Sequence, residues 1–252
     1  MNYSLKFSGI MISFLFFLSA ESVFSEPSAK EIIKTIESKM KGTTSQGKYE
    51  ITIARSRSKR TLLIESWEDS NQKKAFIKIL KPKKDKGITF LKIDQNLWQY
   101  FPEVGKEIKI EGSMLQGNWM GSDMTNDDLV RATSIIDDYT HDFVNSNDQS
   151  LYKVELVPKP HAAVIWSRLV MHVRKSDILP VKQEFYDHKN RLARTMGYSE
   201  YKNMGGRIIP TIFTVKTIKG NRVISSTTLK YITVLFDRPI SNYIFSRANL
   251  RR

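Results

Sequence analysis

The side chains that could carry out chemistry are few in this sequence and stand far apart. The chain has no cysteine, which excludes disulfides, thiolate metal sites and cysteine nucleophiles. No G-x-S-x-G elbow, phosphate-binding loop or dinucleotide-binding fingerprint is present. The four histidines, His141, His161, His172 and His188, are not spaced with one another or with Asp or Glu as a metal site requires. We therefore expect no catalytic residue, no metal, no cofactor and no enzymatic activity.

Three aspartates lie close together in the middle of the chain, at Asp123, Asp127 and Asp128. They lack the spacing of a calcium-binding EF-hand loop. Thr125 and Asp128 instead match a capping box, in which a hydroxyl and a carboxylate satisfy free amides at the start of a helix. The pattern favours helix initiation over cation binding.

Basic residues are in excess, since 40 Lys and Arg against 26 Asp and Glu give a formal net charge of +14. Such an excess indicates an anionic partner, either nucleic acid or a phospholipid surface. Two basic clusters fall at predicted hairpin ends, where solvated charge that protects strand edges is one interpretation. Contact with lipid head groups is the other, at about 1 kcal/mol for each cation near anionic lipid. The residues expected to contact a membrane or partner are Arg55, Arg57, Lys59, Arg60, Lys83 and Lys84.

Residues 1–25 have the order of a secretory signal peptide: Lys6, an apolar run over 10–18, and a small residue at the cleavage site, Ser25. The run is shorter than the roughly 20 residues that a membrane span needs. An uncleaved N-terminal anchor is the alternative. We expect cleavage to leave a single exported domain, residues 26–252, without a lipid-bearing cysteine. Export removes nucleic acid from the expected partners.

The periodicity of the mature chain indicates mainly strands with a few helices. A helix is expected after Ser28, with Ile32, Ile33 and Ile36 on one face and Gly42 at its end. From Lys48 the apolar period changes to two, and turn residues separate about eleven short strands. A segment rich in Gly and Met over 111–124, and a second helix whose apolar face runs from Leu129 to Tyr139, interrupt them. The even spacing without βαβ alternation predicts a sandwich or barrel.

Several expected strands are apolar on both faces. Within 222–236, Ile232, Val234 and Phe236 alternate with Tyr231 and Leu235. An antiparallel strand with one face in water is apolar on the other face only. Either both faces are covered, or one face lines an apolar cavity.

Four segments resemble the outer-membrane lipoprotein-sorting (LolA-like) family. They are Leu-Trp-Gln-Tyr-Phe-Pro at 97–102, Met-Gly-Ser-Asp-Met-Thr-Asn-Asp-Asp-Leu at 120–129, and the strands at 179–187 and 206–211. The resemblance covers the mature chain in order. It implies an α+β fold, an incomplete and strongly curved antiparallel β-barrel with helices covering the open face. It also implies a periplasmic lipid-binding carrier, or chaperone, whose apolar cavity shields the acyl chains of lipoproteins.

In that interpretation the Met- and Trp-rich segment forms part of a lid, because unbranched methionine tolerates varied packing against a chain. The following helix supplies an apolar face over the sheet. Ordinary core packing is the alternative for each residue. The expected cavity and lid residues are Trp98, Met114, Leu115, Trp119, Met120, Met124, Leu129, Ile135, Ile136, Trp166 and Met171.

The partners implied by the resemblance are lipoprotein acyl chains or other lipid, an inner-membrane transporter and an outer-membrane acceptor, with the carrier a monomer. No arginine can be matched to the cavity arginine of the family's carrier without an alignment. A periplasmic sensor or adaptor of the same fold, acting with an inner-membrane protein such as an exporter of the resistance-nodulation-division type, is the alternative. A hydrolase is the third, and it lacks a nucleophile–base pair.

Overall fold

The computed structural model describes residues 1, 26–131, 135–160, 162 and 164–252. The expected signal peptide lies outside the described residues, apart from Met1, and so do His161 and part of the second expected helix. None of the described helices is long and apolar enough to cross a membrane.

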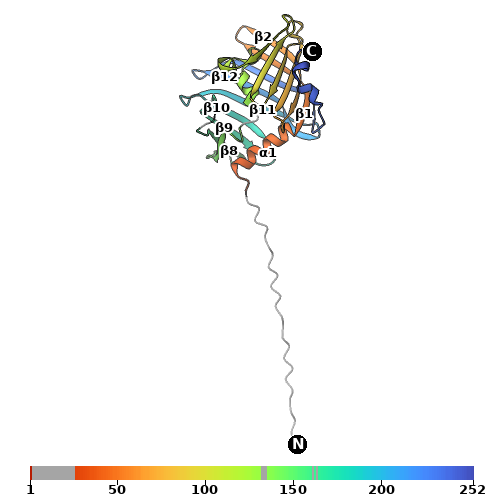
Figure 1. The fold of residues 1–252 in the computed structure, drawn as a ribbon. Coiled ribbons are helices and arrows are strands. Elements are labelled where there is room, and N and C mark those ends of the chain that lie inside the picture. The colour runs from red at the N-terminus through yellow and green to blue at the C-terminus, as the bar shows by residue number, and fades with distance from the viewer. Residues whose placement is uncertain (2–25, 132–134, 161, 163) are drawn as a thin grey trace.

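The described chain forms one antiparallel sheet of thirteen strands that does not close (Figure 1). The spatial order is β6-β5-β4-β3-β2-β1-β13-β12-β11-β10-β9-β8-β7, so the two halves of the meander join where β1 pairs with β13. The expectation of a mainly β chain with an antiparallel, unclosed sheet is confirmed. The strands are β1 (Thr44–Arg55), β2 (Ser58–Asp69), β3 (Lys74–Lys81), β4 (Thr89–Ile93), β5 (Asn96–Phe101), β6 (Lys106–Ile110), β7 (Tyr139–Phe143), β8 (Leu151–Pro158), β9 (Arg168–Arg174), β10 (Pro180–Tyr186), β11 (Leu192–Met204), β12 (Arg207–Lys219) and β13 (Arg222–Phe236).

Helix α1 (Ala29–Lys41) begins and ends as its sequence predicts. The Glu31 amide donates to the Ser28 hydroxyl, and the Ser28 amide donates to the Glu31 carboxylate. Gly42 ends the helix at φ +65°, where a Cβ atom would lie 2.5 Å from the Asp237 carboxylate. The apolar face of α1, with Ile33 at its centre, packs against strands β7 to β10. The contacts of the described helices do not show the expected cover over the whole open face.

The segment between β6 and β7 is mostly short turns of helix: η2 (Gly112–Gln116), η3 (Trp119–Gly121) and α2 (Asn126–Arg131). The capping box at the start of α2 is confirmed, since the Thr125 amide donates to Asp128 (2.7 Å) and the Asp128 amide donates to Thr125 (3.1 Å). The expectation that the helix runs to Tyr139 is wrong. Tyr139 begins β7, which pairs with β8 and forms one edge of the sheet.

Some of the strands that are apolar on both faces are covered on both sides by other parts of the chain, and others are not. In β4, Leu91 faces the C-terminal segment, where Phe245 of η4 (Asn242–Phe245) and Leu250 of α3 (Arg247–Leu250) pack on the convex side of the sheet. In β13, Ile232 and Leu235 are 45% and 55% exposed. The register of β13 shifts beside Ile232, so the simple alternation expected there is wrong.

Candidate functional site

The concave face of the sheet holds a cavity of about 380 Å³ between α1, the segment formed by residues 124–131 with Ile135, and the inner rows of the strands. Its walls are mainly apolar. A volume of this size lies within the range of roughly 300–1,000 Å³ that small-ligand pockets occupy. The apolar and aromatic groups of the wall include Ile36 and Met40 from α1, Met124, Leu129 and Ile135 from the segment, and Trp166, Met171, Phe185, Met196, Tyr198, Phe213 and Tyr231 from or next to the strands.

Four aromatic rings form a continuous strip along one wall. Tyr198 on β11 meets Phe213 on β12 with ring centroids 5.3 Å apart, and Phe213 stacks on Tyr231 of β13 at 5.1 Å. Tyr231 in turn meets Tyr49 of β1 edge-on at 4.7 Å. Burial raises the pKa of the Tyr198 and Tyr231 phenols, so both stay neutral. Aromatic contacts of this kind give the wall a fixed shape.

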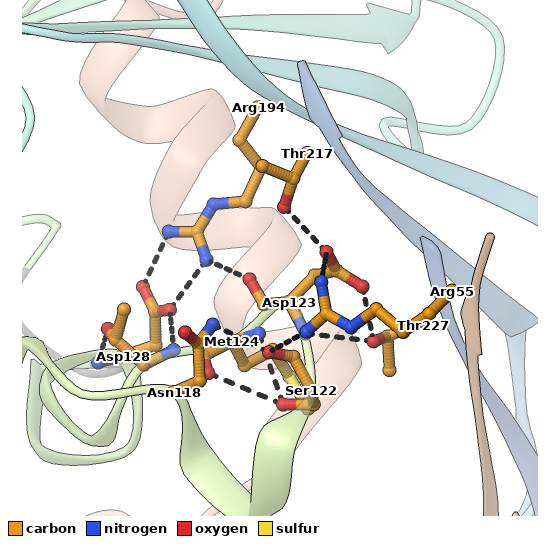
Figure 2. Close-up of polar contacts among 10 residues, drawn as sticks. Arg55, Asn118, Ser122, Asp123, Met124, Asp128, Arg194, Thr217 and Thr227 are labelled. Carbon is orange, nitrogen blue, oxygen red and sulfur yellow. Dashed lines mark hydrogen bonds and ion pairs between the residues drawn. The ribbon is translucent and has the colours of Figure 1, made fainter. Parts of the chain in front are cut away.

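Arg194 on β11 is the central polar group of the cavity and is only 3% exposed. Its guanidinium donates to both carboxylate oxygens of Asp128, at 2.6 and 2.9 Å, and to the Asp123 carbonyl at 2.9 Å (Figure 2). It also lies over the rings of Trp166 and Phe185, at 4.4 and 4.6 Å. A bidentate arginine–carboxylate pair with little exposure to solvent fixes the positions of both side chains, because separating them would leave a charge without its partner. Arg194 therefore ties the start of α2 to the sheet.

Asp123 provides a second attachment beside Arg194 (Figure 2). Its buried carboxylate accepts hydrogen bonds from Thr217 (2.6 Å), Thr227 (2.6 Å) and Ser225. Its amide donates to the Thr227 hydroxyl at 2.8 Å, and Arg55 lies 3.7 Å from the carboxylate. The loop before α2 is thus attached to β12 and β13 by side chains whose hydroxyls are all satisfied within the group.

Five of the expected cavity residues lie on the wall: Met124, Leu129, Ile135, Trp166 and Met171. That they contact a ligand stays a prediction. Ile136 instead packs in the core beneath α1, and Leu115 and Met120 pack against the core of β1 to β5. Trp98 packs with the C-terminal segment and lies under Arg247, with the ring centroid 5.0 Å from the guanidinium carbon.

The expected lid does not lie over the cavity. Trp119 is 1% exposed and packs against Phe90, with ring centroids 5.6 Å apart. Met114 is 44% exposed at the surface, and neither residue lines the cavity. Of the Met- and Trp-rich segment only Met124 reaches the cavity wall, because Leu115, Trp119 and Met120 pack against the β1–β5 core and most of the other residues lie at the surface. A charged residue at Trp119 would therefore test folding and not ligand uptake.

The basic hairpin residues divide into two groups. Arg55 donates to the Gly121 carbonyl (2.8 Å), and Arg60 forms an ion pair with Asp85 and donates to Met120. Both arginines therefore hold the loop before α2, and their contact with a membrane or partner stays a prediction. The other four cations of the expected contact surface are exposed, and their contact with a membrane or partner stays a prediction: Arg57, Lys59, Lys83 and Lys84.

Sequence reasoning missed Arg194 and the hydroxyl groups around Asp123. One signal for Arg194 was present, because the period of two places it on the same face as Met196 and Tyr198. A lone arginine on an otherwise apolar face needs a buried acidic partner. The partner, Asp128, lies 66 residues earlier in the chain, so local pattern does not reveal it.

Glu37, on the cavity side of α1, gives a pH-dependent prediction. Burial raises the pKa of its carboxyl above the usual 4.5, and the nearby Lys41 opposes this rise only in part. A raised pKa means that the folded state favours the protonated carboxyl. The contribution of Glu37 to the free energy of unfolding is therefore present at low pH and is lost as pH rises through the raised pKa. We expect Glu37→Gln to increase the urea midpoint at pH 7 and to leave it nearly unchanged at pH 4. Glu103→Gln in an exposed turn is the control, and a lower midpoint for Glu37→Gln at pH 7 would contradict the prediction.

Among the described residues, no group of three or more His, Asp or Glu is placed to hold a metal ion. The arrangement offers a mainly apolar cavity, with an aromatic wall on one side and a segment held by Arg194 and Asp123 on another. Such a site is suited to holding an apolar chain.

Comparison with known proteins gives a family and a fold. The model of a family described as "-like: Uncharacterized protein" matches residues 71–252, and no curated protein matches the chain. A DUF1329 family protein from Desulfovibrio piger has 22% identity and a TM-score of 0.78, over 88% of this chain and 97% of that one. A LolA superfamily protein from Nitrosomonas europaea has 21% identity and a TM-score of 0.73, over 88% and 99%. An outer membrane lipoprotein-sorting protein domain from Vibrio parahaemolyticus has 20% identity and a TM-score of 0.75, over 89% and 98%.

Proposed function

This chain belongs to the family whose model matches residues 71–252, and it shares the fold of a LolA superfamily protein and of an outer membrane lipoprotein-sorting domain; from this we propose a non-enzymatic carrier. The carrier shields the acyl chains of lipoproteins, or of other lipids, from water in the periplasm. The observation that supports the proposal most is the apolar cavity of about 380 Å³ on the concave face of the sheet.

The energetics of the cavity suit a carrier. Each methylene that leaves water contributes about 0.8 kcal/mol, and the loss of chain and protein freedom offsets part of this sum. Methionine side chains at Met40, Met124, Met171 and Met196 give the wall soft surfaces that adapt to chains of different length. A carrier needs such moderate binding because it must also release its cargo.

Helix α1 and the segment that contains α2 are the parts that cover the bound chain in this proposal. Both contribute residues to the cavity wall, Ile36 from α1 and Leu129 from α2. The Arg194–Asp128 pair and the hydroxyl groups around Asp123 hold the segment closed. Entry of a large cargo would require movement of α1 or of residues near α2.

The proposed partners are those of a chain that crosses the periplasm: an inner-membrane transporter as donor and an outer-membrane acceptor. Export by a cleaved signal peptide at residues 1–25 belongs to the same proposal. The four exposed cations near the β1–β2 turn and at η1 (Lys83–Asp85) are candidate contacts with an anionic membrane surface.

Mass spectrometry of the gently purified protein tests the proposal. We expect the native protein to carry acyl-chain lipid or a lipoprotein that organic solvent releases and that fragments to fatty acids. A protein that is consistently empty, and is recovered bound to one inner-membrane protein, would reject the carrier in favour of a sensor or adaptor.

A further inference from the structure

The polar groups on the cavity wall are not balanced in charge. Among the described lining residues, the carboxylates are Glu37, Glu68, Asp127 and Asp128, and the cations are Lys41 and Arg194. Arg194 pairs with Asp128, and Lys41 lies 3.2 Å from Glu37. The lining carboxylates therefore outnumber the lining cations, in a chain whose net charge is +14.

Glu68 differs from the other lining carboxylates. Asp127 has an interaction partner, whereas no hydrogen bond or ion pair reaches Glu68 from any described residue. Glu68 pairs across the sheet with Ser45 of β1, and Ser45 pairs with Phe236 of β13. All three residues line the cavity, so the Glu68 carboxylate belongs to a row that crosses the cavity wall.

The Glu68 carboxylate lies beside two tyrosines of the aromatic strip. Burial raises the pKa of the Tyr49 and Tyr231 phenols, and the charge of Glu68 raises both further, which places the carboxylate close to the aromatic strip. Lys92 lies two strands away in the same row and does not line the cavity. Burial lowers the pKa of Lys92, and Glu68 opposes this effect. A carboxylate beside apolar surface is stabilised most by a donor that comes with the ligand.

We propose that Glu68 recognises the head of the cargo, and that the preferred ligand is an amphiphile whose polar group carries an ammonium ion. This inference rests on the proposed function, because the apolar part of the amphiphile must occupy the cavity. The ammonium donates to the Glu68 carboxylate, while the chain lies along the strip of Tyr49, Tyr231 and Phe213.

The net positive charge of the whole protein favours an anionic ligand, so a preference for an ammonium ion must come from a local contact. Surface charges are screened over about 8 Å at physiological ionic strength, whereas a contact inside the cavity is screened much less. The local contact with Glu68 therefore decides the equilibrium preference, although an anionic amphiphile is attracted faster.

The experiment compares two probes with the same twelve-carbon chain, dodecylammonium and dodecanoate, at pH 7.5 and 0.15 M salt. Binding is measured by calorimetry below the micelle concentration of each probe. We expect the wild type to bind dodecylammonium about tenfold more tightly than dodecanoate, the factor that one hydrogen bond to a charged group supplies. Glu68→Gln should remove most of that preference and leave dodecanoate binding equal or stronger.

The matched control is Glu65→Gln, on the same strand but on the opposite face, because residues three apart in a strand point to opposite sides. It makes the same change in net charge and should keep the preference of the wild type. Equal affinity for both probes, or a preference that Glu68→Gln leaves intact, would overturn the headgroup assignment while the carrier stands. Failure of both probes to bind would overturn the assignment and the carrier together.

Discussion

Replacing Asp123 with alanine is expected to lower the free energy of unfolding by about 3 kcal/mol or more, a loss typical of breaking a buried charged network. The substitution removes the acceptor of three hydroxyl groups, on Thr217, Ser225 and Thr227. Those on Ser225 and Thr227 are buried and would be left without their partner, which costs more than the bonds themselves are worth. Urea unfolding followed by circular dichroism measures the change.

Two further variants separate the network from a general effect of lost charge. Asp142→Ala, at an exposed position on β7, is expected to change the free energy of unfolding by less than about 0.5 kcal/mol, as surface substitutions usually do. In a double-mutant cycle, Thr227→Val combined with Asp123→Ala should cost less than the sum of the two single changes. A loss below about 1 kcal/mol for Asp123→Ala would show that the loop is held in another way.

Filling the cavity is expected to have the largest effect on binding. Met196 lines the cavity from β11, so Met196→Trp places a bulky indole where the acyl chain would lie. We expect the affinity for a long-chain acyl probe to fall by at least tenfold, or about 1.4 kcal/mol. Fluorescence titration with a probe that brightens in apolar surroundings measures the affinity.

Thr195→Trp is the control for Met196→Trp, because Thr195 is the next residue of β11 and faces the other side of the sheet. It should leave the affinity within about twofold of the wild type, and overpacking at Met196 should cost only about 1–3 kcal/mol of stability. An equal loss in both variants would indicate a general disturbance of β11. Unchanged binding in Met196→Trp would mean that the cavity does not hold the chain.

Local sequence pattern predicted the elements whose causes are themselves local. The capping boxes at Ser28 and at Thr125–Asp128, and the glycine that ends α1, depend on residues within one helical turn. The strands follow the period of two closely enough that a mainly antiparallel β chain was predicted, whereas an unclosed sheet was expected only from the resemblance to the LolA-like family. Tyr139 was predicted to lie in a helix because it continues the 3.6-residue period of Leu129 and Ile136. Its pairing with β8 places it in a strand instead.

Local pattern did not predict which core or cavity the side chains of a segment pack against. Trp119 and Met124 are five residues apart, and one is buried in the β1–β5 core while the other lines the cavity. Arg55 looked like a free surface cation, but its partners, Gly121 and Asp123, lie more than 60 residues away. Contacts of this range depend on the register of the whole sheet, which a single sequence leaves open.

Methyl NMR shows directly whether the cavity on the concave face holds an acyl chain, as we propose. The protein is labelled with ¹³C at its methionine methyl groups and loaded with a palmitoyl chain. Nuclear Overhauser effects are then recorded between the chain and each methyl. We expect contacts from the chain to Met171 and Met196, which line the cavity, and none to Met114, which is exposed at the surface. Contacts confined to Met114, or none to Met171 and Met196 in a saturated sample, would show that the cavity does not hold the chain.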